Sequence, residues 1–231
     1  DSSITALYQS NIKQALGDRK LDYLIINHME PDHCANIEEI VRRYPEVKIV
    51  GNKKTFQFIE QYYSMNMSSN YYEVKEGDEI SLGKHALRFY SAPMVHWPEV
   101  MFTYEITEGI LFSADAFGSF GAMSGNIFAD EVEYDSIFLD EARRYYTNIV
   151  GRYGSQVQVA FKKLAGLKIN MICALHGHIW RGDKVAYIMD KYDHWSRYVP
   201  EKKGVVLVYA SMYGNTENAA NCLAVKLAQR G

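Results

Sequence analysis

The sequence has few cysteines, and those it has are far apart. Cys34, Cys173 and Cys222 are the only three, and no two of them form a CxxC pair. An odd number of separated cysteines argues against a disulfide framework and against an iron–sulfur cluster, and it is typical of the reducing cytoplasm. Cys173 lies within an apolar run, so we expect it to behave as a small buried hydrophobe. We therefore expect a cytoplasmic protein without disulfides.

Long apolar runs and an excess of one charge are also missing. No run approaches the roughly 20 apolar residues of a membrane helix, and no signal-peptide pattern opens the chain. The 25 lysines and arginines nearly balance the 28 aspartates and glutamates. We therefore expect neither a nucleic acid nor a membrane as a partner. What is present is ordinary for a globular protein, because hydrophobic residues make up 48% of the 231 residues.

The first part of the chain alternates between helix and strand patterns. This alternation predicts a sheet with helices on its faces. The first helix is amphipathic and stops at Gly17, and the mainly apolar run that follows it predicts a buried strand. The expected elements are a helix over 1–20, a strand over 21–27, a helix over 36–44, a strand over 47–50 and a helix over 55–63.

From residue 70 the pattern changes to strand-like segments separated by turns that contain glycine. This half is predicted to be antiparallel, with Glu108-Gly109 as a hairpin turn. A helix over 135–164, interrupted near Gly151 and Gly154, then leads to a strand over 169–175 and a helix over 183–198. The expected strands before it are 71–74, 79–82, 85–90, 101–106 and 110–113.

A polar break over residues 200–204 is the expected domain boundary. It divides the chain into a domain over residues 1–200 and a segment over 204–231. The segment begins with an apolar run, Val205 to Ala210, which predicts a buried strand of the parallel type. A helix over 217–230 is expected to follow.

Seven side chains able to bind a metal follow or end apolar runs. One tetrahedral ion needs four ligands, whereas seven suffice for two ions if one carboxylate bridges them. Asp115 stands alone between two of the histidines and is the bridging candidate. The seven candidates are His28, Glu30, Asp32, His33, His96, Asp115 and His176.

Four of these groups lie within six residues at the end of one predicted strand. Without a cation they would repel one another or be desolvated at high cost. A simpler alternative stays open for Glu30 and Asp32, which could cap the following helix. Imidazole and carboxylate ligands without thiolate suit iron, manganese or zinc. The three carboxylates favour a redox-active pair that can hold the +3 state, although a zinc pair can use the same ligand types.

A second candidate site is a turn between the strand and the helix of the C-terminal segment. Its backbone N–H groups, together with the hydroxyls of Ser211 and Thr216, can hold a phosphate dianion. It lacks the lysine of a nucleoside triphosphate loop and has no GxGxxG pattern, which favours a mononucleotide such as FMN. An ordinary strand–turn–helix connection is the alternative. The candidate residues are Ser211, Met212, Tyr213, Gly214, Asn215 and Thr216.

Several separated segments resemble, in the right order, the motifs of the metallo-β-lactamase fold, and within it those of the flavodiiron proteins, also called A-type flavoproteins. Hydrolases of this superfamily usually carry His-x-His-x-Asp-His, and Glu30 replaces the second histidine, as in the diiron branch. The matching segments are His28-x-Glu30-x-Asp32-His33, His96-Trp97-Pro98, Asp115-Ala116-Phe117-Gly118 and His176-Gly177-His178-Ile179-Trp180-Arg181.

The resemblance implies a fold and a ligand set. The fold is an αββα sandwich of the metallo-β-lactamase type, followed by the first βα unit of a flavodoxin-like α/β domain. The resemblance places His28, Glu30 and His96 on one iron, and Asp32, His33 and His176 on the other, with Asp115 bridging them. Some family members leave the residue at the position of His33 off the iron.

The resemblance also implies an activity. A flavodiiron oxidoreductase reduces O2 to water, NO to N2O, or both, with electrons that pass through FMN to two iron ions. Aromatic side chains are expected to line a small pocket for the diatomic gas, and Tyr145 or Tyr146 is a candidate proton donor. The candidate wall residues are Trp97, Phe117, Phe120, Tyr145 and Tyr146.

Partners follow from the same resemblance. The FMN of one subunit would face the diiron centre of the next in a head-to-tail homodimer or tetramer, and a rubredoxin-like carrier or a reduced flavin would supply electrons. Members of the family begin with strands that would precede residue 1, and their flavodoxin domain continues beyond one βα unit. We therefore expect a fragment in which metal ligation is complete and FMN binding is not.

Two other functions are compatible with parts of the pattern. A binuclear metallohydrolase would use a bridging hydroxide to attack an ester or thioester. Glu30 and the flavodoxin-like segment argue against it. A scaffold with a decayed site is the other alternative, and the presence of all seven ligand candidates argues against that.

Overall fold

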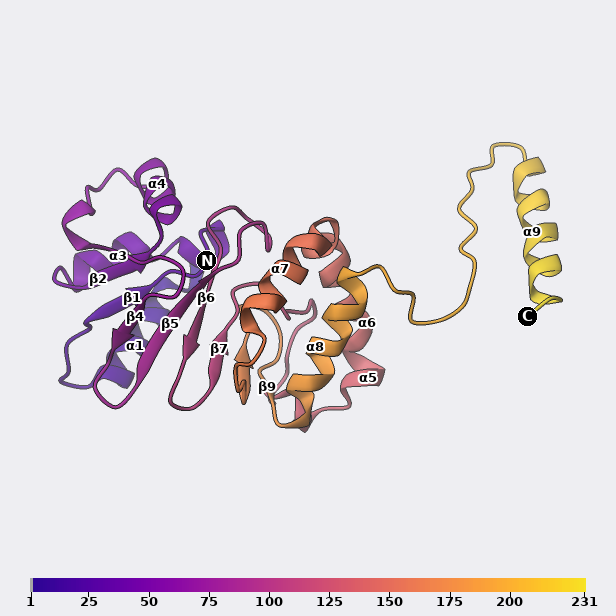
Figure 1. Cartoon of the computed structure of the whole chain (residues 1–231). Coiled ribbons are helices and arrows are strands. Elements are labelled where there is room, and N and C mark those ends of the chain that lie inside the picture. The colour runs from indigo at the N-terminus through magenta and orange to yellow at the C-terminus, as the bar shows by residue number, and fades with distance from the viewer. Residues whose placement is uncertain (1) are drawn as a thin grey trace. The chain divides into compact units, whose positions relative to one another are not determined.

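The structure, a computed structural model, describes residues 2–231. The chain forms two compact units, Asp1–Val199 and Pro200–Gly231 (Figure 1). The larger unit contains both sheets and most of the helices. No helix among the described residues is both long and apolar enough to cross a bilayer.

The first sheet has three strands, all parallel. Its order is β1 (Tyr23–Ile25), β2 (Lys48–Gly51) and β3 (Tyr71–Glu73). Parallel strands need crossover connections, which helices supply. The helices between these strands are α2 (Pro31–Cys34), α3 (Ile37–Arg43), α4 (Lys53–Tyr62) and the 3-10 turn η2 (Ser68–Asn70).

Two sequence expectations for this sheet were wrong. The strand over 71–74 was assigned to the antiparallel half, but β3 pairs in parallel with β2. The strand over 21–27 was expected to be buried, but β1 spans three residues that are only partly buried. The reason is that β1 lies at the edge of its sheet, where one side has no neighbouring strand among the described residues.

The second sheet has six strands in chain order. All neighbours are antiparallel except β7 and β8, which run parallel because a long helical segment connects them. The expected hairpin turn at Glu108-Gly109 is present, and Gly109 has φ of 73°. The strands are β4 (Glu79–Ser81), β5 (Ala86–Ser91), β6 (Met101–Glu105), β7 (Ile110–Phe112), β8 (Met171–Cys173) and the unexpected β9 (Trp180–Arg181).

The long helix expected over 135–164 is divided into five short pieces. Gly154 begins the last of them, and a Cβ there would lie 2.3 Å from the Ser196 carbonyl oxygen, so only glycine fits this approach to the last residue of α8 (Asp183–Ser196). Around this region lie η3 (Ala129–Glu131), α5 (Tyr134–Ile137), α6 (Leu139–Tyr145), the π-helical η4 (Tyr146–Val150), the 3-10 helix η5 (Gly151–Tyr153), α7 (Gly154–Leu164) and α8 (Asp183–Ser196).

Three apolar clusters define the layers of the larger unit. One cluster joins α3 and α4 to the first sheet through residues such as Ile37, Ile49 and Ile59. A second lies between the sheets, where Val50 and Phe89 pack together. The third joins the second sheet to the helices from α6 to α8 (Figure 1). The order helix, sheet, sheet, helix is the αββα sandwich expected from the sequence, and the prediction of the fold class is confirmed.

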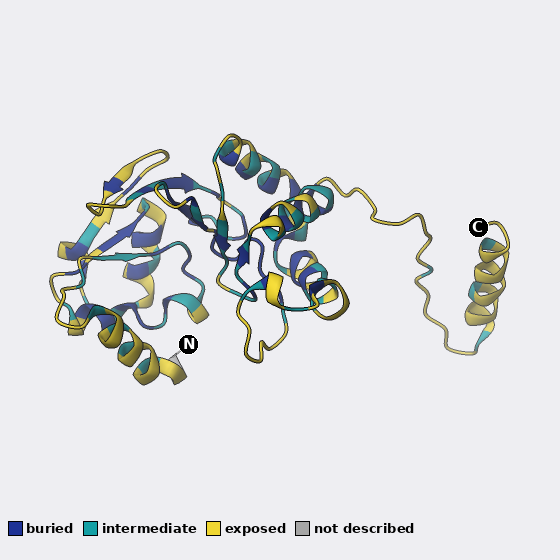
Figure 2. Cartoon of the chain, turned by 90° about the horizontal axis from the view of Figure 1, so that it is seen from below, coloured by how far each residue is buried: buried dark blue, intermediate teal, exposed yellow. Residues whose placement is uncertain are grey.

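The N-terminal helix contributes little to this core. After the 3-10 turn η1 (Ser2–Ile4), helix α1 (Thr5–Leu16) ends at Gly17, whose φ is 58°. The stop at Gly17 was expected, but the amphipathic pattern buries no residue of α1. Figure 2 shows this helix exposed along most of its length.

The smaller unit contains one helix, α9 (Asn215–Ala228), and no strand. The strand expected over Val205 to Ala210 is therefore a wrong prediction for this structure. A strand is stabilised by hydrogen bonds to a neighbour, and this unit offers no second strand. As a result Val206 is 86% exposed and Val208 90% exposed.

Candidate metal centre

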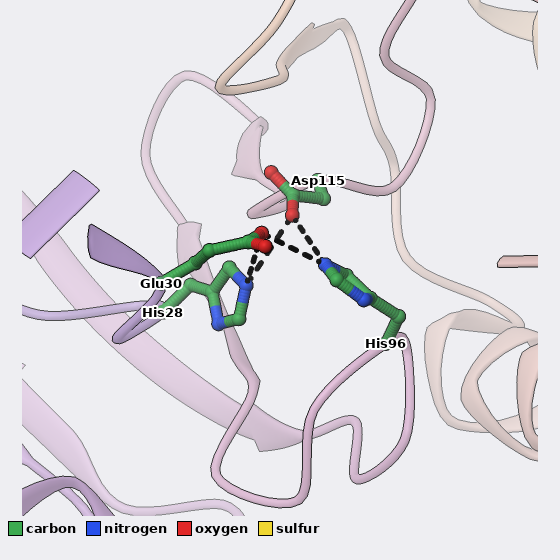
Figure 3. Close-up of side chains that lie close together, drawn as sticks. All are labelled: His28, Glu30, His96 and Asp115. Carbon is green, nitrogen blue, oxygen red and sulfur yellow. Dashed lines mark hydrogen bonds and ion pairs between the residues drawn. The ribbon is translucent and has the colours of Figure 1, made fainter. Parts of the chain in front are cut away.

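Two groups of possible ligands meet at one edge of the αββα sandwich. The first contains His28, Glu30, His96 and Asp115, which point toward one another in Figure 3. The second contains Asp32, His33 and His176. Within each group the ligand atoms lie within 4.8 Å of one another. All seven residues predicted from the sequence are thus brought together.

Strand ends position most of these side chains. His28 and Glu30 follow β1, Asp115 follows β7, and His176 follows β8. Because β7 and β8 are parallel, the residues after them lie at the same edge of the sheet. His96 comes from the loop between β5 and β6.

The short helix α2 carries the rest of the first motif. Pro31 begins it, which suits a residue without an N–H group, and Asp32 and His33 follow within the first turn. Glu30 occupies the N-cap position in extended backbone, yet its side chain makes no capping hydrogen bond. The carboxylate of Glu30 is directed at imidazoles instead, 3.1 Å from His96 Nε2 and 3.5 Å from His28 Nε2. The capping alternative therefore does not describe Glu30.

Asp115 lies between the two groups and turns one oxygen toward each. Its Oδ2 is 2.9 Å from His96 Nε2 and 3.3 Å from His28 Nε2. Its Oδ1 is 3.1 Å from His33 Nε2 and 3.5 Å from His176 Nε2. The residues on either side, Ala114 with φ of 51° and Phe117 with φ of 69°, form the tight turn that holds this carboxylate.

The donor atoms fit two cations. A metal about 2.0–2.2 Å from each nitrogen and oxygen places neighbouring ligand atoms about 3–3.5 Å apart, which matches the observed separations. His28 Nε2 and Asp115 Oδ1 are buried and make no hydrogen bond. In the second group, His33 Nε2 and His176 Nε2 approach to 3.1 Å. Imidazole nitrogens and carboxylate oxygens that converge in this way are expected where a cation accepts their lone pairs.

In the metal-free chain, the charges of the first group shift the pKa values of His28 and Asp115. Burial favours the neutral form of His28, but the carboxylates of Asp115 and Glu99 outweigh it and raise the pKa of His28 to about 9. Burial also opposes ionisation of Asp115, but His28, His33 and His96 hold its pKa well below the ordinary value. The carboxylate of Asp115 is therefore ionised, as a ligand must be.

Aromatic rings stand beside the two groups. Trp97 packs edge-on against His28, with ring centroids 5.3 Å apart, and Tyr145 lies 5.6 Å from His176. Phe120 packs edge-on against Tyr145 at 5.0 Å. The Tyr145 hydroxyl is buried without a hydrogen bond, and burial together with the charge of Asp115 raises its pKa.

The other two aromatic candidates belong to the core. Phe117 stacks on Phe161 and contacts Tyr192. Tyr146 packs against Tyr192 and Trp195, and burial raises its pKa to about 12. The structure therefore favours Tyr145 over Tyr146 as a residue of the site, and Phe117 supports the turn from behind.

Comparison with known proteins agrees with this architecture. Residues 4–177 match the family model described as "ODP family beta lactamase". The chain belongs to this family.

Several similar proteins carry informative names. The nitric oxide reductase of Moorella thermoacetica is 35% identical over 216 residues, which are 93% of this chain and 53% of that protein. The crystal structure of the flavodiiron protein from Giardia intestinalis has a TM-score of 0.87 and 30% identity over 96% of this chain and 53% of its own. Rubredoxin oxygen:oxidoreductase from Desulfovibrio gigas has a TM-score of 0.81 and 32% identity over 90% of this chain and 52% of its own.

The chain thus spans about half the length of these relatives. The resemblance to flavodiiron proteins predicted from the motifs is confirmed, and with it the metallo-β-lactamase-like fold of the ODP family.

The proposed phosphate turn lies beyond the segment that matches the ODP family. Gly214, with φ of 81°, donates its N–H to Ser211 Oγ at 3.0 Å, and α9 begins at Asn215. The side chains of Met212 and Tyr213 are almost fully exposed. The turn and the helix N-terminus are present without the preceding strand, and FMN binding here stays a prediction.

One residue beside the candidate metal centre was not identified from the sequence. Glu99 is completely buried behind His28, 2.7 Å from its Nδ1. The available signal was a carboxylate placed directly before the apolar run Val100 to Phe102, where a charge needs a partner.

Proposed function

We propose that the chain holds two iron ions and forms the catalytic part of a flavodiiron oxidoreductase that reduces O2 to water, NO to N2O, or both. The observation that carries the proposal is Asp115, whose two oxygens each face one group of ligand candidates. The names of the relatives support the same chemistry.

The ligand assignment follows the two groups. His28, Glu30 and His96 would hold one iron, and Asp32, His33 and His176 would hold the other, while Asp115 would contribute one oxygen to each group. His33 is included because its Nε2 lies 3.1 Å from His176 Nε2 and 3.4 Å from Asp32 Oδ2. Mixed imidazole and carboxylate ligation suits iron, and Glu30 separates this set from the usual hydrolase pattern.

Two ferrous ions would supply two electrons together, which is enough to reduce two NO to N2O and water. Reduction of O2 to water takes four electrons, so two more would have to come through FMN. The chain supplies position, shape and protons around them. Trp97 packs against His28 and Tyr145 lies beside His176, with Phe120 packed against Tyr145. Apolar rings beside the candidate centre would favour a small gas over larger polar substrates. Both reductions consume protons, and the Tyr145 hydroxyl stays protonated at neutral pH because burial raises its pKa. The Tyr145 ring lies beside His176, so the hydroxyl is a candidate to donate a proton to a substrate atom.

The rest of the proposed electron path rests on the relatives, of whose length this chain spans about half. We propose that Ser211 to Thr216 hold the FMN phosphate once the full flavodoxin-like domain is present. A rubredoxin-like carrier or a reduced flavin then delivers electrons, as the name of the Desulfovibrio gigas relative indicates for that protein. A head-to-tail homodimer or tetramer would bring the FMN of one subunit near the centre of the next. The three free thiols are consistent with the cytoplasm.

A direct test combines metal analysis with gas consumption. The purified chain, loaded with ferrous iron under anaerobic conditions and chemically reduced, is expected to contain two irons and to consume O2 or NO in a single turnover. The oxidised product should show a coupled diiron signature by Mössbauer spectroscopy. Two zinc ions with ester hydrolysis and no gas consumption would instead identify the binuclear hydrolase, and a chain that binds no metal would identify a decayed scaffold.

A further inference from the structure

Glu99 makes two hydrogen bonds through a single carboxylate oxygen. His28 Nδ1 lies 2.7 Å from Glu99 Oε1, and the Met29 backbone N–H donates to the same oxygen at 2.9 Å. Both side chains of the His28–Glu99 pair are 0% exposed. The two residues are 71 positions apart in the chain, so only the fold brings them together.

This arrangement fixes which nitrogen of His28 carries the proton. A carboxylate oxygen only accepts hydrogen bonds, so the proton between the pair lies on His28 Nδ1 in the neutral ring. The lone pair is then on Nε2, the atom that faces Glu30 and Asp115. The side chain of Glu99 thereby sets both the tautomer and the rotation of this imidazole.

Glu99 is itself anchored by the first sheet. Asn52, which follows β2, donates its side-chain N–H to the Glu99 backbone oxygen at 2.6 Å. The Oδ1 atom of the same Asn52 caps α4 by accepting from the backbone N–H groups of Lys54 and Thr55. These hydrogen bonds of Asn52 connect the loop that carries His96 and Glu99 to the junction between β2 and α4. Glu99 therefore has little freedom to move away from His28.

The second ligand group has a different setting. His28 and Asp115 in the first group are almost fully buried, whereas the side chains of Asp32 and His176 are 46% and 35% exposed. A fully buried carboxylate behind a ligand adds negative charge that solvent does not screen. Among the described contacts, Glu99 places that charge behind the first group.

We propose that Glu99 is a positioning residue that acts through His28 and makes the two metal positions unequal. The metal at His28, Glu30 and His96 is held more tightly and has the more negative reduction potential, while the metal at Asp32, His33 and His176 is released and reduced first. The inference rests on the proposed diiron function. Hydrogen-bonded carboxylates behind metal-bound histidines orient the ring and raise its basicity, and their removal typically costs about 10- to 100-fold in metal affinity.

Two substitutions separate geometry from charge. Glu99→Gln keeps an acceptor oxygen for His28 and removes the charge, whereas Glu99→Leu removes both. Glu105→Gln is the matched control, because Glu105 is a buried carboxylate on β6 that lies 3.1 Å from His85 Nδ1, outside both ligand groups. Circular dichroism and the thermal midpoint of the metal-free proteins establish that each variant is folded.

The measurement is stepwise removal of iron by a chelator, followed by redox titration of the iron-loaded chain monitored by EPR. The unsubstituted chain and Glu105→Gln should release two irons in two separated steps. In Glu99→Leu the later step should move about 10- to 100-fold toward lower chelator concentration and approach the first. In Glu99→Gln that step should move less, while the more negative of the two potentials shifts positive and the other stays in place.

Several results would overturn the inference. Release of both irons in one step from the unsubstituted chain would contradict inequivalent positions. Unchanged release and unchanged potentials in folded Glu99→Leu would show that Glu99 has no influence on the metal. Equal effects of Glu105→Gln and Glu99→Gln would assign the change to lost buried charge in general. Failure of the unsubstituted chain to bind two irons would instead refute the proposed function, so the two failures are distinguishable.

Discussion

Replacing Asp115 with alanine tests the central feature of the site. Because each oxygen of Asp115 faces a different ligand group, Asp115→Ala is expected to abolish binding of both metals. Glu30→Ala and Asp32→Ala each remove a carboxylate from one group only and should leave one metal in place. Glu105→Ala, which removes a buried carboxylate beside His85, is the control for loss of a buried charge.

The magnitude can be worked from ligand linkage. A metal present at 100 times its dissociation constant stabilises the folded state by about 2.7 kcal/mol, so two independent sites contribute about 5 kcal/mol. For a domain of this size, 1 kcal/mol corresponds to a shift of about 2–4 °C in the melting temperature. Iron should therefore raise the melting temperature of the unsubstituted chain by about 10–20 °C, and that of Asp115→Ala by less than about 3 °C.

The assay is differential scanning calorimetry with and without ferrous iron under anaerobic conditions, together with iron analysis after gel filtration. The difference between the two scans of each variant cancels any effect of the substitution on the metal-free fold. Retention of two irons by Asp115→Ala would refute the bridging assignment. Loss of both metals from Glu30→Ala or Asp32→Ala would also refute it, since the two groups would then not be separable.

Three further predictions concern protonation, a glycine and a tyrosine. The pKa of His28 is about 9 in the folded metal-free chain against an ordinary value of 6.5, so its contribution to stability is complete below pH 6.5 and is lost as the pH rises through 9. The urea midpoint of the metal-free chain should therefore fall between pH 6.5 and 9. A midpoint that rises over this range would contradict the raised pKa of His28. Gly177→Ala should lower the free energy of unfolding by about 1–3 kcal/mol more than the control Gly166→Ala does. Both glycines have positive φ, but only at Gly177 would a Cβ lie 2.2 Å from Ser119 Oγ. Equal losses in urea unfolding would refute that contact. Tyr145→Phe should keep two irons, because Tyr145 is not among the ligand candidates, and should change the unfolding free energy by about 1 kcal/mol, the usual net effect of one hydroxyl. It should slow gas reduction about 100-fold or more if the hydroxyl donates a proton, and stopped-flow rates equal to those of the unsubstituted chain would remove that role.

The local sequence pattern gave wrong strand predictions where the outcome depended on a neighbouring strand. Val205 to Ala210 has the composition of a buried parallel strand, but the smaller unit provides no strand to pair with and these residues are exposed. Similarly, the apolar pattern of residues 71–74 identified a strand but not its direction, because pairing with β2 depends on how the chain crosses over α4.

The candidate ligands could be identified from the sequence because they stand in short motifs at the ends of apolar runs. His28, Glu30 and Asp32 are close in sequence, and a strand followed by such residues places them at a sheet edge wherever the sheet lies. Residue type alone also restricted the metal, since imidazole and carboxylate without thiolate suit iron, manganese or zinc. The sequence by itself therefore determined the fold class and the seven candidate ligands.

The tertiary structure decided how these residues are divided and supported. Which oxygen of Asp115 faces which group depends on the turn between Ala114 and Phe117. The pairing of His28 with Glu99 depends on a loop fastened to Asn52, and no periodicity links residues 71 positions apart. Tyr145 and Tyr146 are adjacent in sequence but face the centre and the core respectively, because helical geometry turns neighbouring side chains about 100° apart. Side-chain orientation, burial and contacts between distant residues arise only when the chain is packed. These properties turn a set of possible ligands into a candidate two-metal centre.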